Sequence, residues 1–147
     1  MKFVDQSILH DPENGKYGDC MRACLATIFD APIESIPHRN EDITGEEQDK
    51  MFNEWLARYG VCLQPMSVDG DYFAYMKELG VKTIIHLIYG YTERGTYHAV
   101  VAENGVVIHD PHVSKAGLLP NDAGREWRYV FFMMASNNQR AKAQGEV

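Results

Sequence analysis

The spacing of apolar residues changes along the chain, from a helical period in the first half to runs typical of strands in the second. Leu25, Ile28 and Phe29 recur at the spacing that places side chains on one face of a helix. Asp19 stands where an N-cap residue belongs, and Pro32 prevents the helix from continuing. The sequence therefore predicts a first helix that begins directly after Asp19 and ends shortly before Pro32.

A second helix has the clearest start signal in the sequence. Thr44 and Glu47 have the spacing of a capping box, and Gly60 marks the end of the helix. One face carries the apolar residues Met51, Phe52, Trp55, Leu56 and Tyr59. We expect this face to pack in the core rather than to line a ligand pocket.

Residues 61–67 predict a short strand, and residues 69–79 predict a third helix with Asp69 as its cap and Gly80 after its end. From there on, β-branched and aromatic runs predict strands at residues 82–89, 97–102, 106–109 and 127–134. The turn signal Asn104-Gly105 predicts a hairpin between the second and third of these runs. Helices followed by antiparallel strands predict one α+β domain over residues 1–135, with a polar tail at 136–147.

Charge and cysteine content limit the partners and the compartment. The net charge is −7, and no segment concentrates lysine or arginine, so we expect no nucleic-acid partner. Three cysteines cannot all pair within one chain, and two of them lie in the first predicted helix, which points to a reducing compartment. The N-terminus lacks the apolar run of a signal peptide, and no apolar stretch approaches membrane length. We therefore expect no membrane partner and a cytoplasmic protein, from a bacterial cell or a phage-infected host cell.

Cys20 is the first candidate for chemistry because it falls in the first turn of the first predicted helix. The positive end of a helix dipole stabilises a thiolate, the form of cysteine that attacks carbonyl groups. The alternative is that Cys20 is a small packing residue, as many free cysteines are.

His98 and Asp110 are brought together by the predicted hairpin. Counting outward from Asn104-Gly105 places Asp110 roughly opposite His98 or Ala99. A catalytic imidazole needs such a carboxylate to fix its tautomer and to stabilise its charged form. The alternative is that Asp110 only begins a turn with Pro111, and that His98 is an ordinary strand residue.

Two motifs resemble a known family. The run Asp19-Cys20-Met21-Arg22-Ala23-Cys24-Leu25 resembles the Asp-Cys-Gly-x-Ala-Cys-Leu signature of the bacteriocin-processing leader peptidases, which are papain-like cysteine proteases. The segments 98–101 and 107–111 are similar to that family's histidine strand and later Asp-Pro. The resemblance implies a papain-like fold with Cys20, His98 and Asp110 as the catalytic triad. Met21 replaces the family's glycine, and Asn14 occupies the position of its oxyanion-hole glutamine, six residues before the cysteine.

Other cysteines and histidines offer alternatives. Cys24 lies one helical turn after Cys20, and we expect it to pack in the core. A zinc site is the competing hypothesis, and its candidate ligands are Cys20, Cys24, His98, His109 and His112. Their spacing lacks the two tight pairs that structural zinc sites use, so we expect neither a metal nor another cofactor. His10, His38 and His86 have no evident partner in the sequence and are expected to be ordinary surface or core residues.

The predicted function is a cysteine hydrolase that cleaves a peptide, isopeptide or other amide bond in a peptide or protein substrate. Cys20 would attack the carbonyl, His98 would transfer the proton, and Asp110 would orient His98. Asn14 and the Cys20 backbone N–H would hold the oxyanion. Acyl transfer or deamidation with the same triad is the first alternative. A catalytically inactive relative that only binds a peptide is the second.

Overall fold

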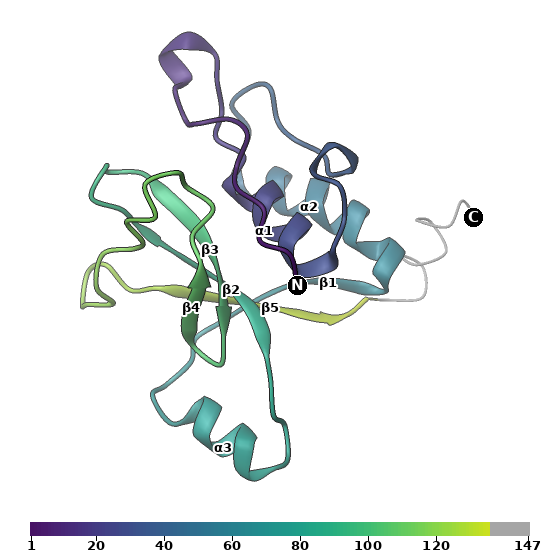
Figure 1. The fold of residues 1–147 in the computed structure, drawn as a ribbon, viewed down its shortest axis with the longest axis vertical. Helices are drawn as coiled ribbons and strands as arrows, with labels where there is room; N and C mark the ends of the chain where they lie inside the picture. Colours follow the sequence, from purple (N-terminus) through teal and green to yellow (C-terminus); the bar gives the residue numbers. More distant parts are fainter. Residues whose placement is uncertain (136–147) are drawn as a thin grey trace.

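A five-stranded antiparallel sheet is the centre of the structure, a computed structural model that describes residues 1–135 (Figure 1). Its strands are β1 (Val61–Met66), β2 (Ile85–Tyr91), β3 (Tyr97–Glu103), β4 (Val106–His109) and β5 (Arg128–Met134). They lie in the order β1-β5-β2-β3-β4, and each neighbouring pair is antiparallel. With the three α-helices described in the same range, this sheet confirms the predicted α+β class.

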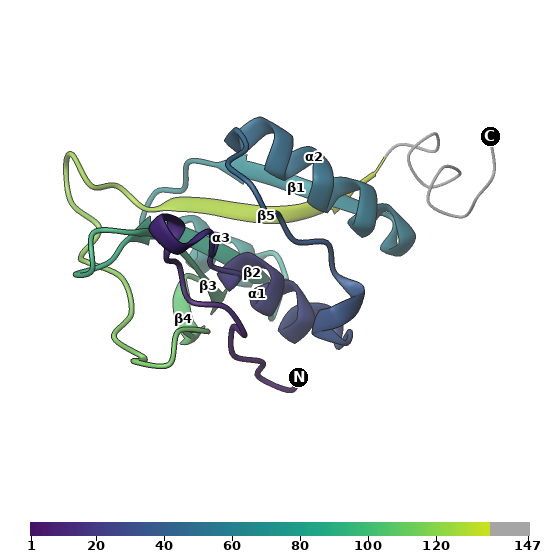
Figure 2. The same cartoon turned by 90° about the horizontal axis from the view of Figure 1, so that it is seen from above.

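The main core lies between the sheet and the helices α1 (Cys20–Phe29) and α2 (Gly45–Leu56), whereas α3 (Tyr72–Glu78) lies apart from both of them (Figures 1 and 2). Leu25 of α1, Leu56 of α2 and Leu87 of β2 are fully buried in this core. Burial of each such side chain contributes roughly 1.5–3 kcal/mol, so the core fixes α1 firmly against the strands.

The first two helices confirm their predicted boundaries. The helix α1 begins at Cys20 and ends at Phe29, and Asp30 after it adopts a left-handed conformation with φ 52°. The predicted capping box of α2 is present, with the N–H of Glu47 donating to the Thr44 hydroxyl and the N–H of Thr44 donating to the Glu47 carboxylate. Its last turn, η3 (Ala57–Tyr59), is a 3-10 helix that ends at Gly60.

Two predicted elements begin later than expected. The helix α3 begins at Tyr72 because the Asp69 carboxylate accepts the N–H of Asp71 and closes a turn before the helix. Strand β2 begins at Ile85, and the side chain of Asn104 bonds the chain just before it: its amide accepts from Ile84 N–H and donates to the Lys82 carbonyl. The hairpin turn therefore holds residues 82–84 through the Asn104 side chain and one backbone bond, from the Asn104 N–H to the Ile84 carbonyl.

The reverse face of the sheet carries a smaller core. Ile88, Val100 and Ala102 pack there against apolar side chains that include Trp127 and Leu118. The indole N–H of Trp127 donates to the carbonyl of Leu119 at 2.9 Å, so the loop before β5 is held over this face. The sheet is therefore covered on both sides at the centre of β2 and β3.

Within residues 1–135, no helix has the length and the apolar character that crossing a membrane requires. The predicted polar tail at 136–147 lies outside the described residues. Cys20, Cys24 and Cys62 are all free thiols.

Candidate active site

The start of α1 is held by a buried aspartate. Asp19 is 1% exposed, and its carboxylate accepts hydrogen bonds from the Ser7 hydroxyl at 2.6 Å and from the Ile8 N–H at 2.9 Å. Asp19 is the N-cap residue, as predicted, but its side chain makes no capping hydrogen bond because the N-terminal segment already engages the carboxylate. The first N–H of α1 with a backbone acceptor is that of Ala23, which donates to Asp19, so the Cys20 N–H has no acceptor within the helix.

His98 and Asp110 meet as the hairpin predicted. The Nε2 atom of His98, in β3, lies 2.7 Å from Oδ1 of Asp110, which follows β4 directly. After a register shift between Val101 and Ala102, His109, the last residue of β4, pairs with Val101. The backbone N–H groups of His112 and Gly117 also donate to Asp110, at 2.9 Å and 2.8 Å. Three donors therefore fix the orientation of this carboxylate.

The electrostatics of this pair favour a charged imidazole. Burial alone would lower the pKa of His98, but its hydrogen bonds to Asp110 and to Cys20 outweigh burial and raise the pKa to about 9. Burial would raise the pKa of Asp110, but the donors around its carboxylate hold that pKa far below its usual value. The arrangement stabilises an imidazolium ion between a carboxylate and a cysteine sulfur.

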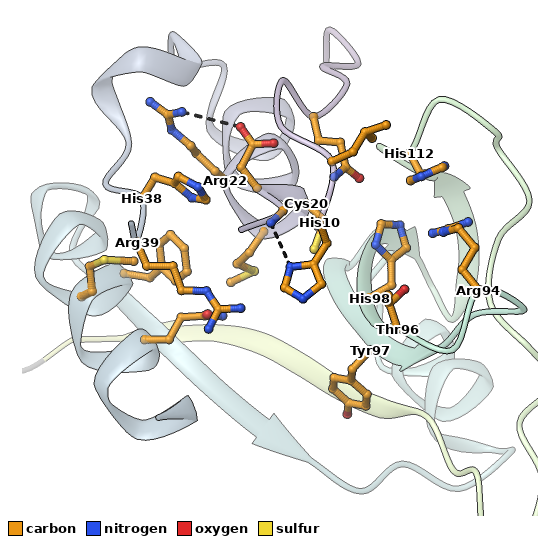
Figure 3. A pocket seen from close by; sticks show the side chains of 18 of the residues that line it. His10, Cys20, Arg22, His38, Arg39, Arg94, Thr96, Tyr97, His98 and His112 are labelled. Carbon is orange, nitrogen blue, oxygen red and sulfur yellow. Dashed lines mark hydrogen bonds and ion pairs between the residues drawn. The ribbon is translucent and has the colours of Figure 1, made fainter. Parts of the chain in front are cut away.

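Cys20 and His98 line one cavity of about 740 Å³ (Figure 3). Figure 3 shows Cys20 and His10 in its middle, with His38 and Arg39 on one side and His98, Arg94 and His112 on the other. Cys20 is half-buried, so its sulfur is both held by the fold and open to a bound molecule. Asp110 is not among the lining residues and contacts the cavity only through His98.

Two histidines of the cavity wall, His10 and His38, were expected to be ordinary surface or core residues. His10 reaches the cavity from the loop before α1, where its Nδ1 accepts the N–H of Gly18 at 3.1 Å. A Cβ on Gly18 would lie 3.0 Å from the Cβ of His10, so this close approach requires a glycine. His38 lies on the loop after α1, and burial lowers its pKa. Only the folding of two loops against α1 brings these residues beside Cys20.

Asn14 is the predicted site residue that the structure does not bring to the cavity. Residues 9–18 fold outward as a hairpin whose base is closed by hydrogen bonds between Ile8 and Asp19. Asn14 lies in the short helix η1 (Pro12–Asn14) at its tip, exposed, and its amide donates to Asp11 at 2.7 Å. A spacing of six residues therefore does not bring its amide to the sulfur, because the intervening chain bends away.

Gln6 lines the cavity instead. It is 8% exposed, its backbone N–H donates to Pro111, and its Nε2 donates to the Ile8 carbonyl at 2.8 Å. Its Oε1 is one of two buried side-chain polar atoms that lack a hydrogen-bond partner within residues 1–135. This unpaired oxygen is an acceptor, so the donor that Gln6 still has available is the second N–H of Nε2. The sequence offered no signal for Gln6 because the hairpin separates it from Cys20 by fourteen positions.

Cys24 and His109 do not line the cavity, and their contacts are packing contacts within the fold. Cys24 is fully buried, its thiol donates to the Ala99 carbonyl at 3.5 Å, and burial raises its pKa well above the usual value. His109 stacks on Phe3 and its Nε2 lies 2.7 Å from the Val4 carbonyl, away from the cavity. In the part of the chain that the structure describes, no three His, Cys, Asp or Glu side chains are grouped to hold a metal ion.

Comparisons with known proteins give no relative for this arrangement. The chain matches no family model, no curated protein and no solved structure. Any functional interpretation therefore depends on the geometry of the cavity and the chemistry of the residues around it.

Proposed function

We propose that the protein is a papain-like cysteine hydrolase that cleaves an amide bond in a peptide or protein, with Cys20, His98 and Asp110 as its triad. The observation that carries the proposal is the 2.7 Å contact between Asp110 and His98, on an imidazole that shares a cavity with a helix-start cysteine. Pairs of a buried histidine with an aspartate also occur as purely structural contacts. In this pair the pKa of His98 is raised, and the half-buried Cys20 lies in the same cavity.

In the first half of the reaction, the Cys20 thiolate attacks the substrate carbonyl carbon and forms a tetrahedral oxyanion. The C–N bond then breaks, and the His98 imidazolium gives its proton to the departing amine. The acyl group is left as a thioester on Cys20. Asp110 keeps Nε2 of His98 hydrogen-bonded, so Nδ1 is the ring atom that exchanges the proton.

The oxyanion is held by two groups near the start of α1. The Cys20 N–H is a free donor at the positive end of the helix, and the Nε2 of Gln6 has a second N–H besides the one bonded to Ile8. Gln6 thus takes the role that the sequence had suggested for Asn14. Donors placed where charge develops lower the barrier without reorganising during the reaction.

In the second half, water attacks the thioester carbonyl while neutral His98 takes its proton, and the acid product leaves with the thiolate restored. Deamidation follows the same course on a side-chain amide and releases ammonia. Acyl transfer differs only in the acceptor, because an amine replaces water.

Selective alkylation tests the nucleophile, and the chain supplies its own control. Cys62 is half-buried like Cys20, but it lies on β1, away from the cavity. At pH 7 we expect iodoacetamide to alkylate Cys20 at least about tenfold faster than Cys62, and His98→Ala to remove this difference. Equal rates for the two thiols in the wild type would refute the proposed nucleophile.

Turnover is tested with a peptide library in H₂¹⁸O, using Cys20→Ala as the blank. Hydrolysis places one ¹⁸O in the new carboxylate, deamidation does so on a side chain, and acyl transfer gives a new amide without ¹⁸O. Labelled backbone cleavage products that require Cys20 support the peptidase assignment. Products of the other two kinds, or no Cys20-dependent product, contradict it.

A further inference from the structure

The charge of the cavity differs from the charge of the chain. The protein has a net charge of −7, yet the residues that line the cavity include Arg22, Arg39 and Arg94. Among these lining residues, Asp19 is the one with a carboxylate, and it is buried and paired with Arg22 at 3.6 Å. The charge of His98 is balanced by the Asp110 carboxylate 2.7 Å away, so the positive field of the cavity comes from Arg39 and Arg94.

Arg39 is oriented by its surroundings but weakly paired. Its guanidinium lies over the ring of Tyr17, 5.0 Å from the ring centroid, and its side chain is only 21% exposed. Its ion-pair partner Asp42 is 3.7 Å away and 91% exposed, and exposed ion pairs contribute little. A carboxylate entering the cavity would meet the guanidinium in a less solvated place and could displace Asp42.

Arg94 occupies the other side of the cavity. One of its terminal nitrogens donates to the Ser114 hydroxyl at 3.2 Å, and within residues 1–135 it has no ion pair. Its charge contributes to lowering the pKa of the neighbouring His112, after the larger effect of burial. His38 is affected in the same way by Arg22 and Arg39. These histidines therefore stay neutral, and the two arginines carry the charge.

We infer that the substrate is an acidic peptide, with carboxylates flanking the bond that Cys20 attacks and contacting Arg39 on one side and Arg94 on the other. The inference rests on the proposed function, because it describes the substrate of the same cavity. Lined by one sign of charge, a cleft in a low-dielectric surface concentrates ligands of the opposite sign. In a chain with net negative charge, a positive cleft also directs acidic peptides to this face rather than to the remaining surface.

Two alkylating agents of similar size measure the field at the sulfur. Iodoacetate is negatively charged and iodoacetamide is neutral; with either one the thiolate displaces iodide and gains a carboxymethyl or a carbamoylmethyl group. We expect the rate with iodoacetate divided by the rate with iodoacetamide at Cys20 to fall about threefold to tenfold in Arg39→Gln and in Arg94→Gln. Arg39→Lys keeps the charge and should keep the ratio. Arg125→Gln, an exposed arginine outside the cavity, is the matched control and should leave the ratio unchanged.

Peptide protection extends the test to the substrate itself. Acetylated tetraglutamate should protect Cys20 from iodoacetamide at a concentration at least about tenfold lower than tetraglutamine, and 0.5 M salt should remove most of this advantage. Equal protection by the two peptides, or a reagent ratio that no arginine substitution alters, overturns the inference. The proposed function fails separately: in that case Cys20 reacts no faster than Cys62 even with the neutral reagent.

Discussion

Two strands of the sheet each carry a buried histidine, and the two residues differ in charge. His98 in β3 and His86 in β2 are 5% and 0% exposed. Nε2 of His86 accepts the N–H of Gly105, its Nδ1 bonds the Leu87 carbonyl, and its ring stacks on Phe73. Burial lowers the pKa of His86, whereas that of His98 is raised to about 9.

The comparison separates burial from the effect of a partner. Burial disfavours the imidazolium in both residues, so it does not explain the difference. The hydrogen-bond partners explain the difference in pKa. His86 bonds backbone groups, which suit a neutral ring, whereas His98 bonds the Asp110 carboxylate and the Cys20 sulfur, which stabilise a charged one. A buried histidine is therefore a candidate for catalysis when an anion holds its proton, and a packing residue when the backbone satisfies both nitrogens.

The largest expected effect is that alanine at His98 lowers the reaction rate, whereas alanine at His86 lowers the stability of the fold. His98→Ala should lower kcat/KM for a cleaved peptide by about 10²–10⁴, because it removes the acid and base. His86→Ala should leave the rate per folded molecule within about twofold but reduce the free energy of unfolding by about 2–3 kcal/mol, since it leaves a cavity and an unbonded N–H. Urea denaturation and steady-state kinetics on both variants measure this; a rate loss at His86 larger than at His98 contradicts it.

The next effect concerns the partner of His98. Asp110→Asn removes the negative charge that stabilises the imidazolium, so the pKa of His98 should fall from about 9. We expect kcat to decrease about tenfold or more and the alkaline limit of activity to move to lower pH. Asp122→Asn, an exposed aspartate outside the cavity, is the control. An alkaline limit that stays in place in Asp110→Asn would show that Asp110 does not set the charge of His98.

A smaller effect is the opposite pH dependence of stability at the two residues. His98 has a raised pKa, so its contribution is fully present below its ordinary value of 6.5 and is lost as pH rises through about 9. His86 has a lowered pKa, so its contribution is present above 6.5 and is lost as pH falls through its folded pKa. For His98, the rise in pKa from 6.5 to about 9 corresponds to about 3 kcal/mol. Urea denaturation from pH 5 to 9.5 gives the free energy of unfolding as a function of pH. His98→Gln should reduce the loss of stability at alkaline pH, and His86→Gln should reduce the loss at acid pH. The reverse pattern would contradict the assigned charges.

The sequence was most informative where one local signal determines a long-range contact. Asn104 and Gly105 adopt the positive φ values of 50° and 83° that a tight hairpin turn requires, and the turn pairs β3 with β4, the strand that Asp110 directly follows. Asp110 then lies 2.7 Å from His98, although the register shifts by one residue between Val101 and Ala102. The capping box likewise placed the start of α2 correctly. In both cases, a short pattern leaves the chain few conformations.

The cavity walls could not be predicted in this way. His38 and Arg39 lie on a loop, and His10 lies on a hairpin whose direction depends on the buried contacts of Asp19 with residues before it. These contacts join residues that are eleven and twelve positions apart, and no periodic pattern encodes them. The same hairpin carries Asn14 away from the cavity and leaves Gln6 beside it.

The smallest expected effect is at Asn14, and it tests whether the hairpin lies outside the site. The Asn14 amide is exposed and bonded to Asp11, so it contributes a turn rather than an oxyanion donor. Asn14→Ala and Asn14→Gln should therefore leave kcat within about twofold. Asn14→Asp should be tolerated almost as well in the rate, although it places two carboxylates at the hairpin tip. Gln6→Ala is the matched comparison, because loss of an oxyanion donor lowers kcat by about 10²–10³ with little change in KM. Steady-state kinetics at pH 7 on the four variants measures the difference. A hundredfold loss in Asn14→Ala with an active Gln6→Ala would return the oxyanion hole to Asn14, and would mean that the hairpin closes over Cys20 when substrate binds.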